Sequence, residues 1–148
     1  MKATAVIGSL CLVLIGLAAA PGLCADAAVS QATEECLGCH AAVHPGIAKG
    51  WHGSRHSMVT PAQAMAVDGL ALKVSSPSVP DVLKEVAVGC AECHTLRPDS
   101  HADTFNHNDY PVHVVVSPDD CAVCHAEEAD QYSKNLMSHA RKNLAGNP

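Results

Sequence analysis

Cys121-Ala-Val-Cys124-His125 is one of three copies of the same short pattern in this sequence; the others are Cys36-Leu-Gly-Cys39-His40 and Cys90-Ala-Glu-Cys93-His94. C-x-x-C-H is the attachment signature of a c-type haem. The two thiols form thioethers with the porphyrin, and the adjacent histidine lies under the iron as its proximal ligand. The sequence therefore predicts three covalently attached haem c groups, with His40, His94 and His125 bound to iron.

The number of cysteines supports this interpretation. Of the eight cysteines, Cys11 and Cys24 lie in an N-terminal apolar segment, and the three motifs use the other six. A zinc site needs two C-x-x-C units for four ligands, and three units do not pair. A thioredoxin-like redox site needs a C-x-x-C beside a βαβ pattern, which this sequence lacks. Both alternatives are weaker than haem attachment.

Residues 1–25 have the features of a secretory signal peptide. Lys2 precedes an apolar run, small residues follow it, and cleavage is expected after Ala25 or Ala27. The alternative is an uncleaved membrane anchor, because the apolar run is near the minimum length that spans a bilayer. Haem attachment requires export with reduced cysteines, so we expect the protein in the periplasm or at the extracellular surface.

The remaining residues, 26–148, are predicted to form one trihaem cytochrome c domain. They contain one Trp, one Phe and two Tyr, which is a poor supply of large side chains for a protein core. Three stacked haems would provide the missing apolar mass. We therefore expect the fold to be packed around the haems and the apoprotein to be largely unfolded.

The charge of the chain limits its partners. The formal net charge is −6, and haem propionates would add to it. Such a protein is not expected to bind nucleic acid or an anionic membrane surface, but it can dock to a basic redox partner protein. No Ser-His-Asp constellation, phosphate loop or nucleotide motif is present, so we predict no catalytic residues within this chain.

The expected secondary structure is mostly α-helical with much irregular coil. Thr33 is the expected N-cap of the first helix, and Pro61 is suited to the first position of a helix over residues 61–72. Residues 73–80 are predicted to form a surface loop. The other predicted segments are a short helix or strand over 81–88, irregular chain over 97–111 and extended coil over 112–116.

The strongest predicted element is a long C-terminal helix. Ser117 can cap this helix, and Pro118 suits its first turn. The carboxylates of Asp119 and Asp120 interact favourably with the positive N-terminal end of the helix dipole. No helix breaker follows until the Gly-Asn-Pro end of the sequence. The sequence thus predicts a helix from about 117 to 144 with the third haem motif on its first turns.

Seven of the ten histidines lie outside the haem motifs, and a low-spin haem needs a second strong ligand. Each of the seven could equally be a surface or hydrogen-bonding histidine. On one continuous helix, His139 would lie about 21 Å from His125 and could not serve the same iron. We predict His56, His113 and His139 as distal iron ligands, with His44, His101 and His107 next.

Seven blocks of the sequence together carry a family resemblance. They are Glu35-Cys-Leu-Gly-Cys-His40, His44-Pro-Gly-Ile, Trp51-His-Gly-Ser-Arg-His56, Val88-Gly-Cys-Ala-Glu-Cys-His94, Thr104-Phe-Asn-His-Asn108, His113-Val-Val-Val-Ser-Pro-Asp-Asp-Cys121 and Gln131-Tyr-Ser-Lys-Asn-Leu-Met-Ser-His-Ala140. With these blocks, nearly all of the chain after residue 25 resembles the octahaem hydroxylamine-oxidoreductase-like multihaem cytochromes. The resemblance implies a mostly helical fold, stacked haems and bis-histidine iron.

The chain departs from that family in length. Family members carry eight haems, and their catalytic haem follows the third motif, whereas this sequence has no fourth C-x-x-C-H. The first hypothesis is therefore an electron-transfer cytochrome that exchanges electrons with a redox partner protein or with further haems of a longer chain. The second is the N-terminal part of a hydroxylamine oxidoreductase or nitrite reductase-type enzyme. The third is a haem left five-coordinate that binds a small ligand.

Overall fold

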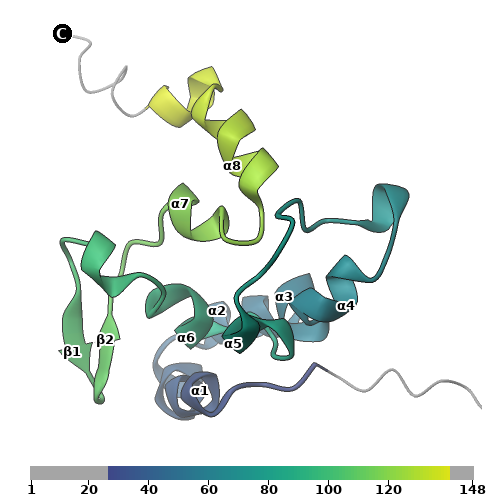
Figure 1. Ribbon diagram of the computed structural model, residues 1–148. Coiled ribbons are helices and arrows are strands. Elements are labelled where there is room, and N and C mark those ends of the chain that lie inside the picture. Colours follow the sequence, from purple (N-terminus) through teal and green to yellow (C-terminus); the bar gives the residue numbers. More distant parts are fainter. Residues whose placement is uncertain (1–26, 141–148) are drawn as a thin grey trace, which may run out of the picture.

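The computed structural model describes residues 27–140 and shows short helices joined by long stretches of coil (Figure 1). The predicted signal peptide, residues 1–25, lies outside the described residues. None of the described helices is both long and apolar enough to cross a membrane. The helices are α1 (Gln31–Val43), α2 (Pro45–His52), α3 (Arg55–Met58), α4 (Pro61–Met65), α5 (Asp81–Lys84), α6 (Cys90–His94), α7 (Pro118–Cys121) and α8 (Ala126–Ser133). The 3-10 turns are η1 (Gly69–Ala71), η2 (Pro98–Ser100) and η3 (Leu136–His139), and the strands are β1 (Phe105–His107) and β2 (Tyr110–Val112).

Helix α1 begins one turn earlier than the sequence predicted. Its N-cap is Ser30, whose side chain accepts a hydrogen bond from the backbone N–H of Thr33. Thr33 lies inside the helix and is completely buried, so its assignment as the cap is wrong. Its hydroxyl is used elsewhere: it donates to the Glu92 carboxylate and accepts from the backbone N–H of Ala91.

Helices α1 and α6, which carry the first and second haem motifs, pack closely against each other (Figure 1). A Cβ atom at Gly89 would lie 2.5 Å from the side chain of Thr33. The chain before α6 is held by three hydrogen bonds: the Trp51 indole donates to Val88 O, Val88 N donates to His56 O, and Ala87 N donates to Ala28 O. This segment therefore anchors α6 to the N-terminal helices.

Helix α4 starts at Pro61 as predicted but is shorter than expected. Thr60 and Gln63 form a reciprocal capping box at its start. The helix ends at Met65, and Gly69 adopts a left-handed conformation, φ 62°, which an α-helix cannot contain. Residues 73–80, predicted to form a surface loop, contain no helix or strand, which confirms the loop. Its placement at the surface is wrong, because Val74, Ser76 and Val79 are buried.

The region predicted to be irregular contains a β-hairpin. Strands β1 and β2 are antiparallel, with Phe105 opposite Val112 and His107 opposite Tyr110. The connecting residues Asn108 and Asp109 both have positive φ, as a two-residue type I′ turn requires. The prediction missed this turn because it took the Pro, Asp, Asn and His content of residues 97–111 as a sign of irregular chain. Extended coil was predicted over residues 112–116; Val112 belongs to β2, which corrects the start of this segment, and residues 113–116 are coil as expected.

The predicted continuous helix from 117 to 144 is wrong within the described residues, because α7 ends at Cys121 and α8 begins at Ala126. The 73–80 loop supplies the reason. Ser76 Oγ donates to Ala122 O, and the backbone N–H groups of Ser75 and Ser76 donate to Cys124 O. These carbonyls would be bonded along the helix axis if the helix continued. A second break follows α8, where the side chain of Asn135 caps η3.

The apolar core of the described chain is small. Its buried cluster consists of Val74, Val79 and Leu83, packed against half-buried side chains that include Met65 and Leu96. The other buried apolar residues in 27–140 are Pro61 and the alanines Ala27, Ala48, Ala87 and Ala91. A core of this size supplies little hydrophobic stabilisation, since each methylene contributes only about 0.8 kcal/mol.

The close approach of α1 and α6 can be tested at Gly89. Gly89→Ala should lower the free energy of unfolding by about 1–3 kcal/mol, because the new methyl group forces Thr33 out of its buried position. Denaturation of the haem-loaded protein, followed by circular dichroism, measures the change. Gly50→Ala in α2 is the matched control, since a Cβ there meets no atom within 4 Å. Equal stability of both variants would contradict the tight packing.

Candidate haem-binding sites

The three C-x-x-C-H motifs occupy different positions on their helices. The first lies in the C-terminal half of α1, and the second is α6 itself. The third starts at the end of α7, crosses a turn and ends at His125, which caps α8. All six motif cysteines are free, so the thiols are available for attachment.

The first motif borders a cavity of about 310 Å³ that also contacts the hairpin. Cys36, Cys39 and His40 line it together with His107 of β1. The rings of His40 and His107 are nearly perpendicular, with centroids 6.0 Å apart. His40 also stacks on His44, and their Nδ1 atoms are 3.1 Å apart. The structure thus places His107, which the sequence ranked below His56, His113 and His139, across the cavity from the first motif.

The third motif borders a cavity of about 260 Å³ with largely apolar walls. His56 from α3 faces His125, with ring centroids 6.1 Å apart. Two imidazoles on opposite sides of one iron would have centroids roughly 6 Å apart, given metal–nitrogen bonds of about 2 Å. Burial, followed by the nearby His125, lowers the pKa of His56 and favours the neutral, ligating form.

The same cavity contains thiols from two motifs. Cys93 of the second motif lines it beside Cys121 and Cys124 of the third. Burial raises the pKa of Cys93 to about 11, with a smaller contribution from the neighbouring thiols and Glu92. A zinc site would require thiolates. Moreover, no thiol belongs to the metal-ligating group found among residues 27–140. The geometry therefore gives no support to the zinc alternative.

The second motif has a different histidine environment. His94 Nδ1 lies 2.8 Å from the carbonyl oxygen of His113, and His113 N donates to the carbonyl of His94. A metal-bound histidine commonly donates its other ring nitrogen to a carbonyl in this way. Iron would then bind Nε2, on the far side of the ring. The main chain of His113 is hydrogen-bonded to Nδ1 of His94. The His113 ring therefore cannot reach the side of that iron opposite His94.

The remaining predicted ligands lie elsewhere. His113 is completely buried and stacks on His101, with centroids 3.6 Å apart. His139 is exposed on η3 and contacts Ser133 O through Nε2. The interruptions around α8 remove the straight helix on which its distance from His125 was argued. The roles of His113 and His139 as iron ligands stay predictions.

Glu92 is a functional candidate that the sequence reasoning missed. Its carboxylate accepts hydrogen bonds from the hydroxyls of Ser30 and Thr33 and from Gly89 N. It lies between the two cysteines of the second motif, yet it binds the start of the helix that carries the first. An acidic residue inside C-x-x-C was the available signal. Glu92 therefore determines how the first two haem motifs are placed relative to each other.

Comparisons with known proteins place these sites in context. No family model and no curated protein matches the chain. A solved structure described as a hypothetical multiheme protein is 45% identical to it, with a TM-score of 0.77. The chain is similar to part of a multihaem protein. The match covers 83% of this chain and 24% of that one. The chain thus spans about a quarter of that protein's length, and the closer resemblance to octahaem hydroxylamine-oxidoreductase-like cytochromes stays a prediction.

Removing the third pair of thiols tests covalent attachment. Cys121→Ala combined with Cys124→Ala should lower the intact mass of the purified protein by one haem, because no thioether can form there. The corresponding double variants at Cys36 and Cys39, and at Cys90 and Cys93, should each lose one haem in the same way. An unchanged haem mass in any of the three would contradict the assignment of that motif.

The facing rings of His56 and His125 predict the ligands of one iron. His56→Ala should retain all covalent haem but convert one haem to high spin, measured by electron paramagnetic resonance. His52→Ala is the matched control, because His52 lies four residues earlier and contacts Trp51. A His56→Ala protein with the unaltered spectrum would show that His56 is not a required ligand.

Proposed function

We propose that this chain is an exported c-type cytochrome with three covalently attached haems, which relays electrons to or from a redox partner. The main support is the lining of one cavity by cysteines of the second and third motifs, Cys93, Cys121 and Cys124. Haems attached there would be close neighbours. The 45% identity to a multihaem protein over most of the chain supports the same interpretation.

Haem supplies the redox chemistry when bound, and the protein controls its ligands, burial and surroundings. The motif cysteines attach the porphyrins, and His40, His94 and His125 are the proximal ligands. We assign His56 as the residue opposite His125 and His107 as the residue opposite His40. His113 and His139 remain candidates from the sequence, although the hydrogen bonds at His94 argue against His113 as a ligand of the second haem.

The expected surroundings of the protein follow from its chemistry and charge. Covalent haem attachment favours the periplasm or the extracellular surface, with residues 1–25 as the signal peptide. The negative net charge favours a basic redox partner protein over nucleic acid or an anionic membrane surface. A longer polypeptide with further haems is the alternative electron acceptor, since the match spans a quarter of its relative. In that case the chain is the N-terminal part of a hydroxylamine oxidoreductase or nitrite reductase-type enzyme.

The geometry at His94 favours a second candidate function. Among residues 27–140, the histidine ring near His94 is that of His113, whose main chain is bonded to the Nδ1 side. The His113 ring, 6.0 Å from that of His94, is therefore on the Nδ1 side and not opposite Nε2, where a distal ligand of the second haem would lie. An open iron position of this kind would bind a small exogenous ligand.

Redox titration and turnover assays distinguish these functions. The purified three-haem protein should show reversible reduction and oxidation and no oxidation of hydroxylamine, because a relay makes and breaks no substrate bonds. Hydroxylamine turnover by this chain alone would contradict the proposal.

Carbon monoxide binding provides the matching test of the open position. Binding to one reduced haem per chain would support the second candidate function at the second motif, and Cys90→Ala combined with Cys93→Ala should then abolish it. Absence of carbon monoxide binding would show that all three irons are six-coordinate and would support the relay alone.

A further inference from the structure

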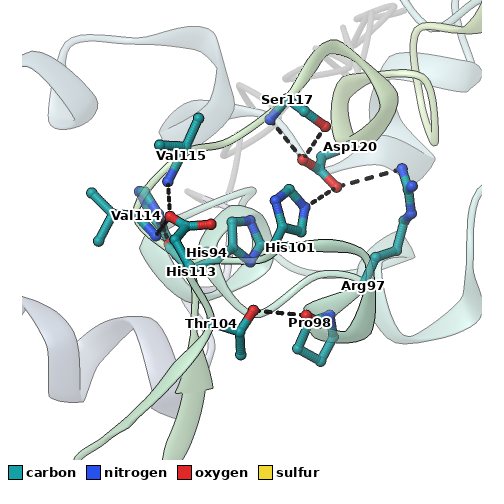
Figure 2. Close-up of polar contacts among 11 residues, drawn as sticks. His94, Arg97, Pro98, His101, Thr104, His113, Val114, Val115, Ser117 and Asp120 are labelled. Atoms are coloured by element: carbon teal, nitrogen blue, oxygen red, sulfur yellow. Dashed lines mark hydrogen bonds and ion pairs between the residues drawn. The ribbon is translucent and has the colours of Figure 1, made fainter.

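A buried group of ligating side chains lies outside the three haem motifs. His101, His113 and Asp120, here called the His–Asp cluster, have ligand atoms that all lie within 4.8 Å of one another (Figure 2). They come from three separate segments: the chain after η2, the chain after β2, and α7. The fold thus brings together two imidazoles and a carboxylate that no local sequence pattern connects.

His113 shows that the cluster is incomplete by itself. Its side chain is completely buried, and within the described residues neither Nδ1 nor Nε2 has a hydrogen-bond partner. Leaving a buried polar group unsatisfied costs about 1–3 kcal/mol. Because the main chain of His113 is bonded to His94, the ring cannot leave for solvent without breaking these contacts. A ligand for the ring would remove the penalty.

Asp120 is held as a metal-binding carboxylate would be. Its side chain is 2% exposed, and Oδ2 accepts hydrogen bonds from both N and Oγ of Ser117, each 2.7 Å long. Oδ1 is left for the cluster and lies 3.1 Å from His101 Nε2. Two ligands of one ion are roughly 3 to 3.5 Å apart when their metal bonds are about 2.1 Å. Ser117 therefore orients the carboxylate from outside the cluster, as conserved neighbours of metal ligands do.

We propose that His101, His113 and Asp120 bind one divalent transition-metal ion, separate from the haem irons. Two imidazoles and one carboxylate form a donor set that suits Zn²⁺, with water in the fourth position. The rings of His101 and His113 are parallel, so binding one ion would require the His113 ring to turn about its Cβ–Cγ bond and present a nitrogen to it. The ion would connect the β1–β2 hairpin region, which follows the second haem motif, to α7, at whose end the third haem motif begins.

Arg97 contacts the same carboxylate that the cation would bind. Its guanidinium lies 3.5 Å from Asp120 Oδ1, and its side chain is 37% exposed. It can therefore move into solvent when a metal ion neutralises the carboxylate. The positive charge of Arg97 opposes the binding of a cation, so its removal should tighten binding.

The competing occupant of His113 is a haem iron, as the sequence predicted. The two possibilities differ in what happens to haem. If His113 binds a non-haem metal, its loss leaves every haem spectrum unchanged. If it binds haem iron, its loss converts one haem to high spin.

Zinc binding to the three-haem protein is the direct test. The protein is stripped with a chelator, loaded with Zn²⁺ and desalted; the metal is counted by mass spectrometry and its ligands are identified by zinc X-ray absorption. We expect one Zn²⁺ per chain, with nitrogen and oxygen ligands at about 2.0–2.2 Å. His113→Ala should lose this zinc. Asp120→Asn, which nearly preserves side-chain shape, should bind it at least tenfold more weakly.

Matched variants separate the cluster from other histidines. His52→Ala removes an exposed histidine to which no ligand role is assigned, and it should leave zinc binding unchanged. Arg97→Gln should bind zinc more tightly than the unaltered protein. Haem content and spin state, measured on each sample, show that the variants have folded and test the cytochrome assignment independently.

Three results would overturn the metal site. The first is a protein with all haems attached that retains no zinc. The second is zinc binding that survives both His113→Ala and Asp120→Asn. The third is conversion of one haem to high spin in His113→Ala, which would assign His113 to a haem instead. A protein without covalent haem would contradict the proposed function and leave zinc stoichiometry as a separate measurement.

Discussion

The contact between α1 and α6 is the constraint on which the arrangement of the haem motifs depends. A buried threonine hydroxyl, the Glu92 carboxylate and the absence of a side chain at Gly89 bring the two helices together. Each helix carries a C-x-x-C-H motif, so this contact determines the relation of the first two attachment sites. A carboxylate with three hydrogen-bond donors is stabilised despite partial burial, because charge-assisted hydrogen bonds are roughly twice as strong as neutral ones.

The third motif is tied to the second by a shared cavity instead of a helix contact. Cys93 reaches the space that Cys121, Cys124 and His125 surround, and His56 closes its other side. The apolar side chains that line this space are of small or medium size, such as Val74, Leu83 and Val123, and the buried residues elsewhere are mostly alanine or polar. On the proposed function, bound haems would supply the large apolar surfaces that the amino acids lack. The same haems would therefore both relay electrons and stabilise the fold.

Two serines show how tertiary contacts can override local preference. Residues 117–140 have the capping and composition of one helix. Ser75 and Ser76 nevertheless donate hydrogen bonds to the carbonyl oxygens of Ala122 and Cys124, which a continuous helix would use itself. Each intruding hydrogen bond replaces one along the helix at little net cost, because the two kinds of bond have similar energies. The break turns His125 toward His56. Sequence reasoning missed it because the serines lie some 50 residues away, in a segment correctly predicted to be a loop.

The sequence by itself determined the three C-x-x-C-H motifs and the haem attachment that they predict, since thioether and proximal-ligand chemistry needs only five consecutive residues. It also predicted the mostly helical class with much coil and the start of α4, which depend on neighbouring residues. Only the tertiary structure decided which histidines face one another. His107 reaches His40 through the turn at Asn108 and Asp109, and His113 is fastened beside His94. These pairings join residues far apart in the chain, so they depend on packing, which local sequence patterns do not specify.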